Sequence, residues 1–209
     1  WRTFGLRRRV RTSRTPAPAW GLGSPSWCPV VVDGSTGGTQ IALLGQFEVR
    51  VANRSVSIKS PNERALLARL ALEPGTAVPP DSLIEAIWPH GKRPDDPARA
   101  LRYHVWHLRD LLEPDRADRS DGALVLTRPT GYMLAIDPSA VDALRLEAEW
   151  NSVRMLEVDL QHRRDLLGLL LDAWRPACFA ESSMPGPLSE AAIRLDRLRS
   201  AVLADRISA

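Results

Sequence analysis

Arginine and aromatic side chains share one face of an amphipathic segment, residues 97–112. Four apolar residues in this segment are spaced i, i+4, i+7 and i+11, which places them in one stripe along a helix. Arginine neutralises phosphates and donates to base edges, and aromatic rings contact thymine methyl groups, so the opposite face has the chemistry of DNA recognition. The stripe consists of Leu101, Val105, Leu108 and Leu112, and the opposite face holds Arg99, Arg102, Tyr103, Trp106 and Asp110.

A second explanation of the two aromatic residues stays open at this point. A helix face that only meets solvent rarely carries Tyr and Trp, so Tyr103 and Trp106 are expected to contact another surface. Instead of DNA, that surface can be a neighbouring hairpin or a second domain, because aromatic and arginine side chains serve both packing and recognition.

A turn with a basic residue follows further along the chain. Strand-like runs at 123–127 and 132–136 flank the sequence Arg128-Pro129-Thr130-Gly131, which predicts a β-hairpin. Arg128 and Thr130 at its tip suit contacts with phosphate oxygens. We therefore expect the hairpin to place them on the DNA backbone or in the adjacent minor groove.

The elements that precede the amphipathic helix indicate how it is positioned. Residues 41–58 alternate apolar and polar side chains, which is typical of half-buried antiparallel strands. Two shorter helices are expected next, at 61–72 and 81–88. Strands, three helices and a hairpin, in this order, predict an α+β winged helix-turn-helix, whose third helix can enter a major groove beside the wing. The predicted N-caps are Ser60, Asp81 and Asp95 or Asp96, and Glu63 completes a capping-box spacing with Ser60.

The composition divides the chain into three parts. Residues 1–40 are rich in Arg, Pro and Gly and have no sustained period, so we expect a disordered tail, although an Arg-rich, nearly acid-free start also suits an organellar transit peptide. The winged helix is expected at 41–137. Residues 138–209 are helical by pattern, with helices expected at 140–158, 161–174 and 187–207, and form an all-α segment.

Five segments of the chain form a recognisable set of motifs, namely Phe47–Val49, Glu63–Leu67, Leu83–Trp88, Ala100–Arg109 and Thr127–Tyr132. Together these motifs resemble the antibiotic regulatory protein family of actinobacteria. That family joins an OmpR-type winged helix to a helical transcriptional activator domain built like tetratricopeptide repeats. The resemblance implies the same arrangement here, with a helical domain that is incomplete, because stacked repeats need about three units. The chain departs from the family at Trp106-His107, where a small polar residue and Arg are usual, and at Thr130, where Gly is usual.

Charge and motif searches exclude other classes of function. The net charge of +3 over 209 residues comes from the tail at 1–40, since 41–137 is neutral and 138–209 is negative. His90, His104 and His107 lack the cysteine or paired acid that would complete a metal site, so no metal is expected. The glycines at 34–38 lack the Lys of a phosphate-binding loop, so no cofactor is expected either. No apolar run approaches the roughly 20 residues of a membrane span.

We therefore expect a cytoplasmic, sequence-specific DNA-binding transcriptional regulator without enzymatic activity, with activation favoured over repression. Its partners are expected to be double-stranded DNA, with RNA polymerase and a second copy of the chain as further candidates, and no membrane. The alternative is a protein-interaction scaffold whose winged helix does not read DNA. The expected DNA-binding residues are Arg99, Arg102, Tyr103, Trp106, His107, Arg109, Arg128 and Thr130.

Overall fold

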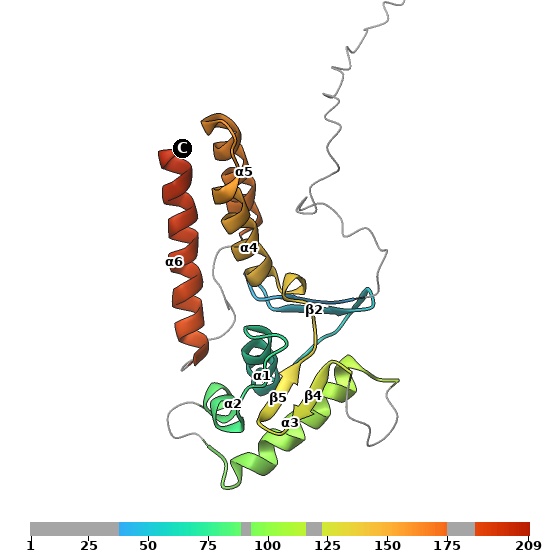
Figure 1. The fold of residues 1–209 in the computed structure, drawn as a ribbon. Helices are drawn as coiled ribbons and strands as arrows, with labels where there is room; N and C mark the ends of the chain where they lie inside the picture. The colour runs from blue at the N-terminus through green and yellow to red at the C-terminus, as the bar shows by residue number, and fades with distance from the viewer. Residues whose placement is uncertain (1–37, 89–92, 116–122, 175–186) are drawn as a thin grey trace, which may run out of the picture. The chain divides into compact units, whose positions relative to one another are not determined.

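A computed structural model describes residues 38–88, 93–115, 123–174 and 187–209 (Figure 1). These residues all fall within one compact unit. The predicted fold class is confirmed, since a winged helix with two small sheets is followed by helices. The predictions for residues 1–37 and for His90 lie outside the described residues. The first strand begins at Thr39, slightly before the predicted start of the winged helix at residue 41.

A three-stranded antiparallel sheet opens the fold. It consists of β1 (Thr39–Ala42), β2 (Glu48–Val51) and β3 (Arg54–Ser55), in that order. Ile41 lies opposite Val49, and both side chains are buried. Ala52 and Asn53 both have positive φ, the conformation of a tight two-residue turn, and they join β2 to β3.

Three helices follow this sheet. They are α1 (Pro61–Ala71), α2 (Pro80–Ile87) and α3 (Pro97–Leu112). Each has proline in its first turn, where the missing N–H costs no helical hydrogen bond. The predicted caps of α1 and α3 are confirmed, because Ser60 accepts from the backbone N–H of Glu63 and Asp96 accepts from that of Arg99.

Two capping predictions are wrong. Helix α2 begins at Pro80 with Pro79 as its N-cap, so Asp81 lies in the first turn instead of capping the helix. An acidic side chain is favourable there because it faces the positive end of the helix dipole. Glu63 does not return to the Ser60 backbone as a capping box requires, because its carboxylate is bound to α3 instead.

The wing is a hairpin of β4 (Val125–Arg128) and β5 (Gly131–Leu134). Its outer edge pairs with the segment between α1 and α2, since Val78 and Tyr132 exchange backbone hydrogen bonds of 2.8 and 3.1 Å. Gly131 is required at this contact because a Cβ atom there would lie 2.0 Å from the Val78 carbonyl oxygen. The wing is therefore attached directly to the body of the domain.

The second half of the chain is helical. A short 3-10 turn, η1 (Pro138–Ala140), leads to α4 (Asp142–Met155), α5 (Leu160–Ala173) and α6 (Pro187–Ser208), close to the predicted ranges. Figure 1 shows α4 and α5 side by side with α6 running beside them, and α5 packs on both neighbours. Their shared core is apolar and consists of Leu146, Val153, Leu167, Leu170, Trp174, Leu195 and Val202.

Contacts join the two halves across the predicted boundary near residue 138. Asp142 at the start of α4 accepts hydrogen bonds from the backbone N–H groups of Leu43 (2.8 Å) and Leu44 (3.1 Å). Val141 bridges to Ile41 of β1, and α6 packs on α1 and α2. The helical half therefore satisfies backbone N–H groups of the segment that directly follows β1. No helix in the described part of the chain is long and apolar enough to cross a membrane.

Candidate nucleic-acid interface

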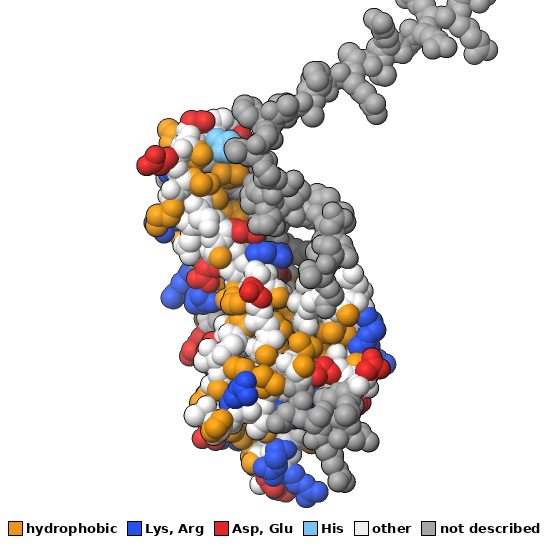
Figure 2. Space-filling view, turned by 45° about the vertical axis from the view of Figure 1, so that its right-hand side comes forward, with side chains coloured by type: hydrophobic (Ala, Val, Ile, Leu, Met, Phe, Trp, Pro, Cys, Tyr) orange, Lys and Arg blue, Asp and Glu red, His pale blue; other side chains and the backbone are white. Residues whose placement is uncertain are grey.

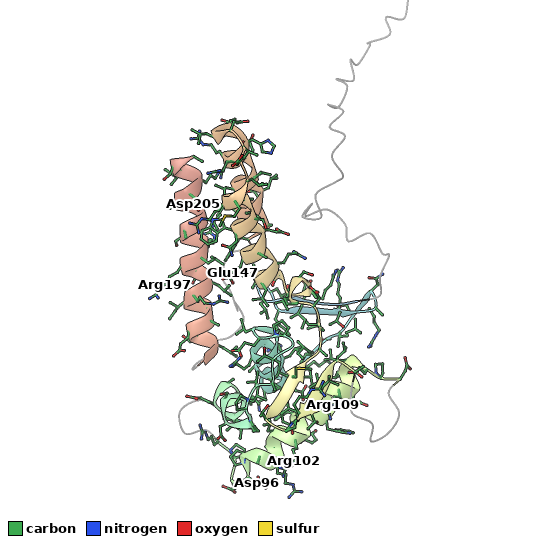
Figure 3. The ribbon with its side chains drawn as sticks, in the orientation of Figure 1. Asp96, Arg102, Arg109, Glu147, Arg197 and Asp205 are labelled. Atoms are coloured by element: carbon green, nitrogen blue, oxygen red, sulfur yellow. The ribbon has the colours of Figure 1, made fainter. Side chains whose placement is uncertain are left out.

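The predicted register of α3 is confirmed by burial. Leu101, Val105, Leu108 and Leu112 are all buried in the core. On the opposite side lie Arg99, Arg102, Tyr103 and Trp106, which we call the exposed face of α3. Figure 3 shows Arg102 near the start of α3, and Figure 2 shows Lys and Arg side chains beside acidic ones at that end of the domain.

The aromatic residues of this face are open to solvent. Tyr103 is 59% exposed and Trp106 is 55% exposed. Their ring centroids lie 6.4 Å apart, so the two side chains form one apolar surface. Packing against the wing or the helical half, the second explanation of these residues, is not observed among the described residues.

His107 is held by a buried carboxylate. Glu63 on α1 is only 3% exposed, and its Oε1 atom lies 2.7 Å from Nδ1 of His107. The Nδ1 atom of His104 is 3.5 Å from the same oxygen, without hydrogen-bond geometry. An ionised carboxylate only accepts, so His107 donates from Nδ1. Only the Nε2 atom of the half-exposed His107 ring is therefore left for a DNA contact.

Arg109 is directed to the wing. Its Nε atom donates to the Val125 carbonyl oxygen and its Nη2 atom to Thr127 Oγ1, both at 2.8 Å. Figure 3 shows Arg109 on the part of α3 that lies beside the hairpin. The structure therefore places this residue between the two DNA-contacting elements expected from the sequence, the helix and the wing.

A second set of hydrogen bonds joins the end of α3 to the wing. The carboxylate of Glu113, the C-cap residue of α3, accepts from the backbone N–H groups of Ala123 and Leu124, both at 2.7 Å. The tip residues Arg128 and Thr130 are exposed. The wing is thus fixed to both α3 and the Val78 segment, while its tip remains accessible.

Among the described residues, no group of three or more His, Cys, Asp or Glu side chains is arranged so that it could hold a metal ion. His104 and His107 do lie close to one carboxylate, but that carboxylate is the buried Glu63. Glu63 and Glu113 position α3 and the wing, a role that no pattern in the sequence indicates. Their partners are distant or backbone groups, and the contact between Glu63 and His107 spans 44 positions, so no local spacing reveals it.

Comparison with known proteins identifies the winged helix. Residues 54–134, which include α1 to α3 and the wing, match the family model described as "Transcriptional regulatory protein, C terminal". The chain carries a transcriptional regulatory winged-helix domain. It is 27% identical over its full length to the transcriptional regulator RedD of Streptomyces coelicolor, and 30% identical over 177 residues, 82% of the chain, to the regulatory protein AfsR of the same organism.

The chain matches only part of each of these relatives. The chain spans 59% of the length of RedD and 17% of that of AfsR. The structure of EmbR from Mycobacterium tuberculosis has the same fold over 81% of this chain and 42% of that chain, with a TM-score of 0.58 and 23% sequence identity. The similarity in sequence to RedD and AfsR confirms the resemblance to the antibiotic regulatory proteins.

Proposed function

We propose that this chain is a sequence-specific DNA-binding transcriptional regulator, and that α3 lies in the major groove of its target. The observation that carries the proposal is the exposed face of α3, where two arginines and two aromatic residues lie opposite a fully buried apolar stripe. This arrangement leaves guanidinium groups free to meet phosphates and base edges while the helix stays anchored in the domain.

The expected DNA-binding residues take different roles in this proposal. Arg99 and Arg102 contact phosphates or base edges, and Arg128 and Thr130 place the wing tip on the adjacent backbone. Arg109 acts as a positioning residue, because its guanidinium donates to β4. His107 offers Nε2 to the groove while Nδ1 stays on Glu63.

The helical half is proposed to serve association. Met155, Leu160 and Ile207 are exposed apolar residues at the ends of its helices. Exposed apolar surface of this kind is typical of contact sites, and the partners we propose are RNA polymerase or a second copy of the chain. Activation of transcription follows from such recruitment. We propose no catalytic role, and a cytoplasmic location, where DNA and RNA polymerase are present.

The test is selection of binding sites from random duplexes with the full chain, followed by titration at several salt concentrations. We expect one enriched motif and an affinity that falls steeply with salt, because phosphate contacts release counterions. Arg102→Ala weakens binding to the motif. Arg197→Ala is the matched control, since Arg197 is an exposed arginine on α6 (Figure 3) and its removal should leave affinity unchanged.

The scaffold alternative predicts a different result. If no motif is enriched and the affinity for duplexes is weak at physiological salt, the winged helix does not read DNA. Sedimentation of the same preparation then decides whether the exposed residues of the helical half bring two copies together.

A further inference from the structure

The exposed face of α3 contains a large apolar surface that nothing in the described part of the chain covers. More than half of the Tyr103 and Trp106 side chains is open to water. Leaving aromatic area in water is unfavourable, and aromatic residues contribute most when they are buried on binding. Burial of the two rings on binding is therefore most favourable when the partner of α3 presents an apolar group to them.

Arginines flank this surface along the helix. Arg99 precedes Tyr103 by four positions and Arg102 precedes Trp106 by four, so each ring follows a guanidinium by about one turn. In a major groove the guanidinium groups can bind phosphates or guanine, whereas the rings need an apolar group. The thymine C5-methyl is the apolar group that the major groove presents among its hydrogen-bonding atoms.

The aromatic surface is also held in place. The Tyr103 ring lies nearly parallel to the His107 ring, with 3° between the planes and 6.3 Å between centroids, and it meets the His104 ring edge-on at 5.6 Å. His107 is in turn anchored on Glu63. Because the Tyr103 ring already lies against two histidine rings of α3, it loses less conformational freedom on binding than a side chain without such contacts would.

We propose that Trp106, supported by Tyr103, reads the methyl group of a thymine in the major groove. This inference rests on the proposed function. It adds that the target duplex has a thymine at a base pair that α3 contacts. Trp106 then determines specificity at this step, while Arg99 and Arg102 hold the helix in the groove. A contact of this kind discriminates thymine from cytosine and also from uracil, which differs from thymine only by the methyl group.

The test uses the duplex selected for the full chain, in which each thymine is replaced in turn by deoxyuridine. This replacement removes only the methyl and keeps base pairing and the O4 acceptor. We expect a ~3–10-fold loss of affinity at one or two positions, the range for losing one buried methyl contact. Trp106→Ala should bind the original duplex more weakly and should no longer distinguish thymine from deoxyuridine there.

Arg102→Ala is the matched control. It should bind more weakly overall and still show the deoxyuridine loss. Thermal unfolding of Trp106→Ala should match that of the wild type, because the indole is exposed, which separates recognition from folding. If a motif is selected but no deoxyuridine position matters, or if Trp106→Ala keeps the same loss, the inference is wrong while the proposed function stands. If no motif is selected, the proposed function itself fails.

Discussion

The Nδ1 atom of His107 on α3 lies 2.7 Å from Oε1 of Glu63 on α1, a carboxylate buried in the core. The contact joins the helix that we propose for recognition to the helix beneath it. The contact also fixes the orientation of the His107 ring, because its Nδ1 atom must point at the Glu63 carboxylate and donate to it. Because the rings of Tyr103 and Trp106 lie beside the His107 ring, their orientation depends on the buried Glu63 carboxylate that holds His107.

Replacing His107 by Ala should lower the free energy of unfolding by about 1–3 kcal/mol, the range for a hydrogen bond to a charged group whose partner is left buried. Urea unfolding of the purified chain measures this loss. In a double-mutant cycle, His107→Ala should have a much smaller effect on a Glu63→Gln background, because the buried charge is already gone. Equal losses on both backgrounds would mean that the two side chains do not interact.

Arg109 and Arg128 should respond differently to salt. Arg109 donates to Val125 and Thr127, so Arg109→Ala should weaken DNA binding by loosening the wing and leave the dependence of log affinity on log salt unchanged. Arg128→Ala at the exposed tip should lower that slope by about one phosphate contact. Titrations of both variants at several salt concentrations distinguish them. A reduced slope for Arg109→Ala would place its guanidinium on the DNA.

Gly131→Ala should detach the wing from the domain. The new Cβ would lie 2.0 Å from the Val78 carbonyl oxygen, at a residue with φ of +149°, so we expect a loss of about 2–4 kcal/mol. Gly75→Ala is the control, because Gly75 also has positive φ but open space around it, and its loss should be about 1–2 kcal/mol. Chemical denaturation measures both, and equal losses would argue against the contact with Val78.

Asp142 should make stability depend on pH. Burial raises the pKa of this carboxyl above its ordinary value. The hydrogen bonds from the backbone of Leu43, Leu44 and Ala143 lower the pKa, but burial is the larger effect. The folded chain then keeps the proton to higher pH than the unfolded chain does. The free energy of unfolding should therefore fall as the pH rises from about 4 through the raised pKa, and level off above it.

Comparison with Asp142→Asn isolates this effect from the other titrating groups. The wild-type free energy of unfolding minus that of the variant should decrease over the same pH window. A difference that stays constant, or that grows with pH, would show that the folded chain does not raise the pKa of Asp142.

The elements of the fold were accessible from the sequence because they rest on local patterns. The stripe from Leu101 to Leu112 predicted which side of α3 is buried, and Ser60 and Asp96 predicted where two helices begin. The predicted N-cap of α2, Asp81, was wrong. Asp81 and Pro80 are both favourable in the first turn of a helix, and spacing alone does not decide which residue precedes that turn.

The contacts that position the candidate site could not be predicted from local patterns in the sequence. Glu63 has the spacing of a capping box, yet its carboxylate binds His107, because a buried tertiary partner outweighs a local backbone contact. Arg109 has the residue type of a DNA contact but donates to β4. Both outcomes depend on how α1, α3 and the wing meet, which no periodicity along the chain encodes.

Dimethyl sulfate footprinting of the selected duplex tests most directly whether α3 lies in the major groove. The reagent methylates guanine N7 in the major groove and adenine N3 in the minor groove, so one reaction reports on both. When the chain saturates the duplex, we predict that guanine N7 atoms within the motif are protected, and that Arg102→Ala reduces this protection. Guanine N7 atoms that react as in free DNA while adenine N3 atoms are protected would contradict the account.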